Sequence, residues 1–498
     1  METVEAMEEK YDDFFKKAED IADVIKDAIK NNGQTKIISH LDTDGITAAG
    51  IIATALYRAE ASFQVSIIRQ LEEDIMATLS KGKENVDIFI FTDLGSGQLG
   101  LVRKYLDIKK TKVVILDHHP PTGNENGVFQ LNPHLFEING SYDISGAGVS
   151  YFTALAMDAK NLDLSVLAVI GAIGDRQDKG EQGSFTGLNT RIVDDAVNAQ
   201  VLEVKKDLRL FGRMTRPVHT ALEYTTDPYI PSITGNRDAC FKLLIELQIP
   251  LKKGDEWRSI VDLTTEERTK LVSALITRSL QHGVSSDEAQ SIVGNVYTLV
   301  KEKEGGILRD AREFASCLNA CGRMGSAGVG VALCMGDRKR AYKDAEDVLT
   351  KYRTRLSDHV SLISDNTDRI VDFENVQIFD GKRLVDDRII GTIIGLARSS
   401  NMLSSEKIVL GIALQEDEGF IKVSGRSTEK LVSKGISIGK ALSDAAQGIE
   451  GVEAGGHDIA AGARVPLEKE QEYIKLVREN IDKQYEKLES VKNVQDNG

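Results

Sequence analysis

The feature that most constrains this sequence is the tripeptide Asp117-His118-His119, which directly follows the apolar, β-branched run 111–116. Such a run is typical of a buried strand. Pro120-Pro121 follows at once and cannot continue a strand or enter a helix interior. We therefore expect a carboxylate and two imidazoles where a strand of an open α/β sheet ends, which is where such sheets bind ligands.

A second acidic segment follows the predicted strand 36–40. His40-Leu-Asp42-Thr-Asp44-Gly45 leads into a helix that is predicted to begin near Ile46. If the segment stays extended, its alternate residues His40, Asp42 and Asp44 face the same side and can converge. Gly45 then allows a tight turn into the helix. The alternative interpretation is a helix N-cap rich in aspartate.

Two more apolar segments end in an aspartate. The predicted strand 86–92 precedes Asp93-Leu-Gly-Ser-Gly97, and the buried segment 166–174 ends in Gly174-Asp175. Asp93 alone could simply start a turn. Because strand and helix alternate through residues 36–175, we expect a mainly parallel sheet with right-handed crossovers and with these acids at the carboxyl ends of its strands.

The predicted strand ends supply more ligands than one cation needs. They are four carboxylates and two imidazoles, namely Asp42, Asp44, Asp93, Asp175, His40 and His118. Two divalent cations about 3.5–4 Å apart, bridged by one carboxylate, would account for them. The mixed nitrogen and oxygen set favours Mn²⁺, with Mg²⁺ as the alternative. Such a pair activates water and stabilises in-line displacement at phosphorus, so the residues predict a phosphoester hydrolase.

In this order, the four motifs resemble those of the DHH phosphoesterase superfamily, and Gly455-Gly-His457-Asp-Ile-Ala-Ala-Gly462 resembles the signature of its associated small domain. Within the superfamily the chain is most similar to archaeal RecJ-like nucleases of the GINS-associated type. The resemblance implies an α/β fold with the active site in the cleft between two α/β domains. We expect a parallel-sheet DHH catalytic domain at 1–200, a mainly helical middle region at 201–365, and a smaller DHH-associated, substrate-binding domain with a C-terminal helix at 366–498.

The resemblance also assigns the metal ligands. His40 and Asp42 would bind one metal, Asp93 would bridge, and the other metal would be bound by Asp44, His118 and Asp175. Bacterial relatives have an aspartate where His40 stands. A role for His40 in supporting a ligand, instead of binding metal, therefore remains open.

Further residues are expected to contact the substrate. The resemblance places His119 on the scissile phosphate or leaving oxygen, and has Asp117 orient a neighbouring histidine or touch the metal shell. Arg426, at a predicted strand end, is placed to bind a phosphate bidentately. Gly455, Gly456 and His457 would bring backbone N–H groups to a phosphate or sugar. The alternative for His457 is a buried structural histidine.

The middle of the chain is predicted to be mostly helical, with a short strand at 331–334. The expected helices are 186–210, 265–281, 286–300, 309–324 and 345–363. Arg209–Arg216 is a basic cluster that contains an aromatic residue, which suits single-stranded nucleic acid. The alternative is a solvated linker and packing turn.

Composition restricts the protein class further. A net charge of −15 argues against coating duplex nucleic acid, although bound metals and a local basic groove still allow a nuclease. The four cysteines lack metal-binding spacing and are expected to be buried thiols, which fits a reducing cytoplasm. Residues 1–31 lack the apolar core of a signal peptide, and no apolar run approaches the roughly 20 residues of a membrane span. We therefore expect a cytoplasmic protein without membrane association.

These observations predict a divalent-metal-dependent exonuclease that hydrolyses single-stranded DNA or RNA by a two-metal mechanism. The resemblance adds a role in DNA replication or repair, with the GINS replication complex or a repair helicase as partner. One alternative is a small-molecule DHH phosphoesterase, such as a nano-oligonucleotide hydrolase or nucleotide phosphatase, against which the long middle region argues. The other is a replication scaffold with secondary nuclease activity.

Overall fold

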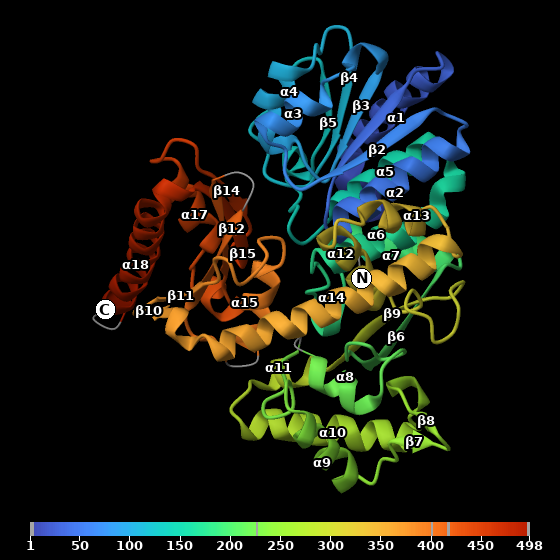
Figure 1. Cartoon of the computed structure of the whole chain (residues 1–498). Helices are drawn as coiled ribbons and strands as arrows, with labels where there is room; N and C mark the ends of the chain where they lie inside the picture. The colour runs from blue at the N-terminus through green and yellow to red at the C-terminus, as the bar shows by residue number, and fades with distance from the viewer. Residues whose placement is uncertain (1–3, 226–227, 400–401, 416–418, 496–498) are drawn as a thin grey trace. The chain divides into compact units, whose positions relative to one another are not determined.

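The computed structural model describes residues 4–225, 228–399, 402–415 and 419–495, and the chain forms two compact units, residues 1–350 and 351–498 (Figure 1). The long helix α14 (Arg340–Asp365) contains the boundary between them. Among the described residues, no helix has both the length and the apolar character that crossing a membrane requires. All four cysteines are buried free thiols, as predicted.

The first unit is built on a five-stranded, entirely parallel sheet, which confirms the predicted sheet. In spatial order its strands are β2 (Phe63–Ile68), β1 (Thr35–His40), β3 (Ile88–Thr92), β4 (Lys112–Leu116) and β5 (Val128–Leu131). Ser39 pairs with Thr92, and Thr92 pairs with Leu116. The residues that follow β1, β3 and β4 therefore emerge side by side at one edge of the sheet.

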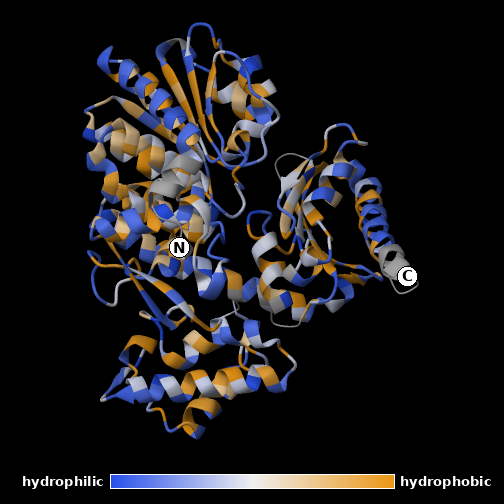
Figure 2. Cartoon of the chain, turned by 180° about the vertical axis from the view of Figure 1, so that it is seen from behind, coloured by the Kyte–Doolittle hydropathy of each residue, from blue (hydrophilic) through white to orange (hydrophobic). Residues whose placement is uncertain are grey.

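Helices cover both faces of this sheet, and its central strands are accordingly apolar along their length (Figure 2). On one face Phe89 and Phe91 pack against α3 (Glu73–Leu79) and α4 (Leu99–Tyr105). The helices of the other side and of the layer beyond it are α1 (Val4–Lys30), α2 (Thr43–Arg58), α5 (Gly146–Met157), α6 (Ser165–Gly174) and α7 (Gly187–Asn198) (Figure 1).

The middle of the chain contains more strand than predicted. Strands β6 (Leu202–Leu208) and β9 (Val293–Leu299) form an antiparallel pair. The predicted helix 186–210 is therefore correct for α7 and wrong after it, and the predicted helix 286–300 is correct for the short α11 (Ser286–Gln290) and wrong after it. The predicted strand 331–334 is also wrong, because it is the end of α13 (Ala327–Cys334). The predicted helices at 265–281 and 309–324 are confirmed as α10 (Thr265–Gln281) and α12 (Ala311–Arg323).

Between β6 and β9 lies a small helical subdomain with its own apolar core. Besides α10 and α11 it contains α8 (Val218–Tyr224), α9 (Arg237–Glu246) and the hairpin β7 (Lys252–Lys253) and β8 (Glu256–Trp257).

The basic cluster that precedes this subdomain serves the fold. Arg209 is buried and pairs with Asp178 at 3.0 Å. Arg213 is also buried and pairs with Asp207 at 3.3 Å. A buried, paired guanidinium is not presented to a ligand, so the prediction of a nucleic-acid-binding cluster is wrong for these two arginines.

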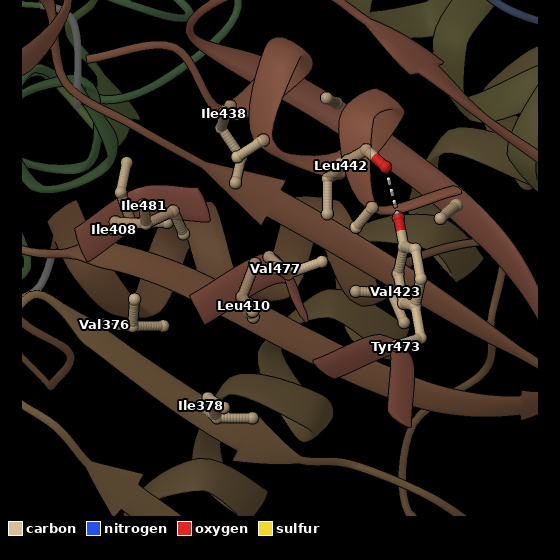
Figure 3. Close-up of a cluster of buried hydrophobic side chains, with 14 of the residues drawn as sticks. Val376, Ile378, Ile408, Leu410, Val423, Ile438, Leu442, Tyr473, Val477 and Ile481 are labelled. Carbon is tan, nitrogen blue, oxygen red and sulfur yellow. Dashed lines mark hydrogen bonds between the residues drawn. The ribbon is translucent and has the colours of Figure 1, made fainter. Parts of the chain in front are cut away.

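The second unit is a six-stranded mixed sheet, which matches the predicted smaller α/β domain. Its strands, in spatial order, are β10 (Ile370–Asp372), β11 (Val376–Asp380), β12 (Ile408–Gln415), β13 (Phe420–Arg426), β15 (Ala460–Pro466) and β14 (Glu453–Gly456). Its helices are α15 (Ile390–Ser399), α16 (Glu429–Ser433), α17 (Ile438–Ala446) and α18 (Glu470–Gln495). The core between the sheet, α17 and α18 is aliphatic, and the Tyr473 hydroxyl donates to the Leu442 carbonyl at 3.0 Å (Figure 3).

Candidate metal centre

The junction of β1 and α2 supplies the first group of polar side chains. His40 is the last residue of β1, and Asp42 is the N-cap of α2, where its carboxylate accepts from the Gly45 N–H at 3.0 Å. Asp42 is therefore a cap, and it also lies 2.9 Å from Nδ1 of His40. Because α2 begins at Thr43, the expected extended path as far as Asp44 is wrong.

Asp44 lies in the first turn of α2 and faces the N-terminus of α5. Its two carboxylate oxygens accept from the N–H groups of Gly146 at 2.7 Å and Ala147 at 3.0 Å. A helix N-terminus carries a partial positive charge and unpaired N–H groups, so it stabilises a buried carboxylate. Asp44 is thus fixed by a helix other than its own.

Asp93 occupies the centre of the cluster. It follows β3 with a φ of +58°, in the left-handed region that aspartate tolerates better than most residues. Its carboxylate is buried and lies 3.2 Å from Nε2 of His118 and 3.6 Å from Nδ1 of His40. Neither of its oxygens accepts a hydrogen bond from the described residues. A Cβ on Gly146 would come within 2.7 Å of Asp93 Oδ1, so the start of α5 must be glycine here.

The tripeptide after β4 holds its two histidines in different ways. His118 is buried, and its Nδ1 donates to the carbonyl of Gly140 at 2.7 Å. His119 is partly exposed, and its Nδ1 lies 2.9 Å from Asp117 Oδ1. Asp117 is itself fixed by the N–H groups of Ser96 at 3.0 Å and His118 at 2.8 Å. Asp117 therefore orients His119, and the Gly140 carbonyl orients His118, in each case through Nδ1.

Asp175 reaches the cluster from a helix. It is the C-cap of α6, so its expected position at a strand end is wrong. The segment 166–174 is apolar on all sides and almost entirely buried, and such a segment gives no periodicity by which a strand could be told from a helix. The Asp175 carboxylate accepts from Nε2 of Gln177 at 2.8 Å and lies 3.8 Å from Nδ1 of His118.

The clustered acids disfavour one another's ionisation. Burial, together with the charge of Asp93, raises the pKa of Asp44 well above its usual range. Burial also raises the pKa of Asp175, to about 6, where Asp93 adds to the shift and His118 opposes it. Added positive charge would relieve this repulsion.

The same negative charge favours protonation of the imidazoles. Burial alone would lower the pKa of His40, but Asp42 and Asp93 outweigh it and raise that pKa to about 10. Burial likewise opposes protonation of His118, and Asp175, Asp93 and Asp44 together raise its pKa. The site thus attracts positive charge, which bound cations would provide.

The donor atoms gather into groups that fit metal ions. His40, Asp42 and Asp93 offer ligand atoms within 4.8 Å of one another, and so do Asp44, His118 and Asp175. A third such group is Asp93, His118 and His119. Asp93 is shared, and its buried oxygens, which accept no hydrogen bond from the described residues, suit coordination. Carboxylate oxygens with imidazole nitrogens are ligands that Mn²⁺ accepts.

Sequence reasoning missed two residues that orient or stabilise ligands in this cluster, Gln177 and Arg323. Gln177 donates to Asp175 at 2.8 Å and to the carbonyl of Gly140 at 2.9 Å. The charge of Arg323, on α12, helps to hold the pKa of Asp42 low together with His40, against the effect of burial. For Gln177 the local signal was its position two residues after Asp175. Arg323 is far from Asp42 in the sequence and gave no local signal.

The second unit brings its predicted residues together across one strand. Strand β15 lies between β13 and β14, where Arg426 pairs with Ala460 and Gly456 pairs with Ala461. The His457 N–H donates to the Ala460 carbonyl at 2.9 Å. The Arg426 guanidinium lies against Gly391 of α15, where an added Cβ would come within 2.5 Å of it.

Comparison with known proteins assigns the parts of the chain. Residues 34–172 match the N-terminal domain of the DHH family, residues 210–293 match the DHH-CID domain and residues 377–483 match the DHHA1 domain. The uncharacterized protein MJ0831 of Methanocaldococcus jannaschii is 32% identical over 477 residues, which are 94% of this chain and 98% of that protein.

Solved structures share the fold at low identity. RecJ from Thermus thermophilus, in complex with Mn²⁺, is 16% identical with a TM-score of 0.56 over 94% of this chain, and the chain spans 55% of that RecJ. CDC45 from Entamoeba histolytica is 13% identical with a TM-score of 0.63, and the match covers 94% of this chain and 99% of CDC45.

Proposed function

We propose that this protein, which belongs to the DHH superfamily as a RecJ-like protein, is a divalent-metal-dependent exonuclease acting on single-stranded DNA or RNA. The observation that carries the proposal is the buried carboxylate of Asp93 at the carboxyl edge of a parallel sheet, which groups with His40 and Asp42 on one side and with His118 and His119 on the other. We infer that His40 and Asp42 bind one ion, that Asp44, His118 and Asp175 bind the other, and that Asp93 bridges them.

Two ions at this site, Mn²⁺ or Mg²⁺, would supply an activated water and the charge that stabilises in-line displacement at phosphorus. The chain orients the groups around the reacting phosphate. His118 presents Nε2 because its Nδ1 is occupied by the Gly140 carbonyl. His119 is placed to contact the scissile phosphate or the leaving oxygen. Burial and His118 oppose its protonation, but Asp117 outweighs them and raises its pKa, which favours an imidazolium that donates to a phosphate oxygen.

In the proposal, the second unit holds the strand. Arg426 would bind a backbone phosphate. Gly455, Gly456 and His457 would approach a phosphate or sugar through the backbone of β14 and the turn after it. We further propose, from the likeness to RecJ-like nucleases, a cytoplasmic role in DNA replication or repair, with the GINS replication complex or a repair helicase as partner. Co-purification of the tagged protein with either partner would test this part.

The test of the activity uses the pure full-length chain with Mn²⁺ and oligonucleotides labelled separately at each end. The substrates are single-stranded DNA, single-stranded RNA, a duplex and a dinucleotide. We expect mononucleotides to be released from one end of a single strand, with little cleavage of the duplex. Asp93→Ala should abolish release, whereas Asp107→Ala, a change at an exposed aspartate outside the cluster, should not.

The same experiment separates the rival functions. Hydrolysis of the dinucleotide without cleavage of long strands would replace the exonuclease by a small-molecule phosphoesterase. No cleavage of any substrate would favour the scaffold. Cleavage that survives Asp93→Ala would contradict the proposed site.

A further inference from the structure

Helix α12 lies in a part of the chain, residues 294–376, that none of the three matched domains covers. Within the first unit it packs against α2 and α6, the helices that carry Asp44 and precede Asp175 (Figure 1). One contact places it on Leu41, between His40 and Asp42, and a second places it on Thr43, directly after Asp42.

The first contact is between two backbones. A Cβ on Gly322, near the end of α12, would lie 1.7 Å from the carbonyl oxygen of Leu41. Side-chain carbons do not approach other atoms this closely, so only glycine fits. Leu41 stands between His40 and Asp42, and the last turn of α12 therefore sets the path of the chain between these two residues.

The second contact is a buried hydrogen bond. The Thr43 hydroxyl donates to the Ala315 carbonyl of α12 at 2.7 Å. On its other side Thr43 meets the end of α6, where a Cβ on Gly174 would come within 2.4 Å of the Thr43 Cβ. Thr43, which directly follows Asp42, is thus clamped between α12 and α6.

Helix α12 is anchored independently of this loop. Its N-cap Asp310 accepts from the N–H groups of Arg312 at 3.0 Å and Glu313 at 3.2 Å. Glu313 in turn accepts from the Met214 N–H at 3.2 Å. The helix can therefore serve as a fixed template for the loop.

The other group of ligand atoms is held by different elements. Asp44 is fixed by the N-terminus of α5, His118 by Gly140, and Asp175 by Gln177. A change in the contact between α12 and the loop should therefore affect His40 and Asp42 and leave that group in place.

We propose that α12 positions the His40–Asp42 loop for metal binding, with Gly322 and Thr43 as the positioning residues. The inference rests on the proposed function, because it concerns one of the two metal sites of that proposal. It predicts a selective defect, in which one of two bound ions is lost from variants that keep the fold.

The test measures Mn²⁺ binding to the full-length protein by titration with electron paramagnetic resonance of the free ion. We expect two bound ions in the unaltered chain. In Thr43→Val, which removes the hydroxyl but keeps the volume, one ion should bind about 10- to 100-fold more weakly while the other is unchanged. Thr43→Ser keeps the donor and should restore both sites.

Gly322→Ala should show the same selective loss. Its matched control is Gly328→Ala on α13, where no heavy atom of the described residues lies within 4 Å of an added Cβ. Circular dichroism of the metal-free variants should match the unaltered chain, and both variants should still unfold cooperatively, although at a lower temperature because of the added Cβ or the lost hydrogen bond. Two undisturbed ions in both Thr43→Val and Gly322→Ala, or equal weakening of both ions, would overturn the inference. An unaltered chain that binds no Mn²⁺ would overturn the proposed function itself, and the inference with it.

Discussion

The Nδ1 atom of His118 lies 2.7 Å from the carbonyl oxygen of Gly140. A carbonyl only accepts, so this nitrogen carries the hydrogen, and the other ring nitrogen, Nε2, faces Asp93 at 3.2 Å. The same carbonyl accepts from Gln177 at 2.9 Å, and Gln177 also donates to Asp175 at 2.8 Å. The Gly140 carbonyl therefore orients His118, and the Gln177 amide orients Asp175.

We expect Gln177→Leu to weaken Mn²⁺ binding by about 10- to 100-fold, because groups that orient metal ligands typically contribute this much. The measurement is a calorimetric titration of Mn²⁺. Gln290→Leu, at an exposed glutamine remote in sequence, is the control. Equal affinity in both variants would show that Asp175 needs no such support.

Asp93→Asn should separate activity from stability. Cleavage should fall by about 1000-fold or more, because the ions supply several kcal/mol of transition-state stabilisation and each 1.36 kcal/mol is a factor of ten. The metal-free variant should nevertheless stay folded, since the lost charge of Asp93 repels Asp44 and Asp175 as well as attracting His40 and His118. Denaturant unfolding in a chelator tests this, and a variant that is already unfolded without denaturant would contradict it.

Metal binding should release protons near pH 7.5. His40 has a pKa of about 10 and must lose its proton to coordinate a metal, and the raised pKa of His118 favours its protonated form in the same way. Affinity should therefore rise with pH. Calorimetric titration in buffers of different ionisation enthalpy gives the number of protons released when the metal binds. His40→Asn should lower this number by one. An unchanged number would mean that His40 supports a ligand and does not bind metal.

A pH effect on stability is expected away from the metal centre. Burial, reinforced by the charge of Asp310, raises the pKa of Glu313 to about 7. The folded state therefore retains a proton that the unfolded state loses near pH 4.5, and the stability from this group is full below that pH and is lost as pH rises through 7. Relative to the unaltered chain, Glu313→Gln should gain up to about 3 kcal/mol between pH 5 and pH 8. A pH-independent difference in the free energy of unfolding would contradict this.

Local sequence patterns predicted correctly the elements whose structure is determined by residues close together in the sequence. The parallel sheet and the strand ends before Asp93 and Asp117 follow from short β-branched runs bounded by turn residues. The amphipathic pattern and the capping box at Thr264 mark helix α10 in the same way. These signals need no partner from elsewhere in the chain.

Long-range contacts decided the rest. The pairing of β6 with β9 joins segments about ninety residues apart, and the charged stretch Lys205-Lys206-Asp207 obscured the strand pattern. Asp175 was placed on a strand because α6 is apolar on every side. The positions of Thr43 and Gly322 depend on where α12 packs, which no local pattern encodes.

Anomalous diffraction from crystals of the full-length protein soaked in Mn²⁺ tests the central claim most directly. The account predicts two anomalous peaks about 3.5–4 Å apart, one beside His40 and Asp42, the other beside Asp44, His118 and Asp175, with Asp93 touching both. A single ion, or ions that avoid Asp93, would contradict the two-metal centre.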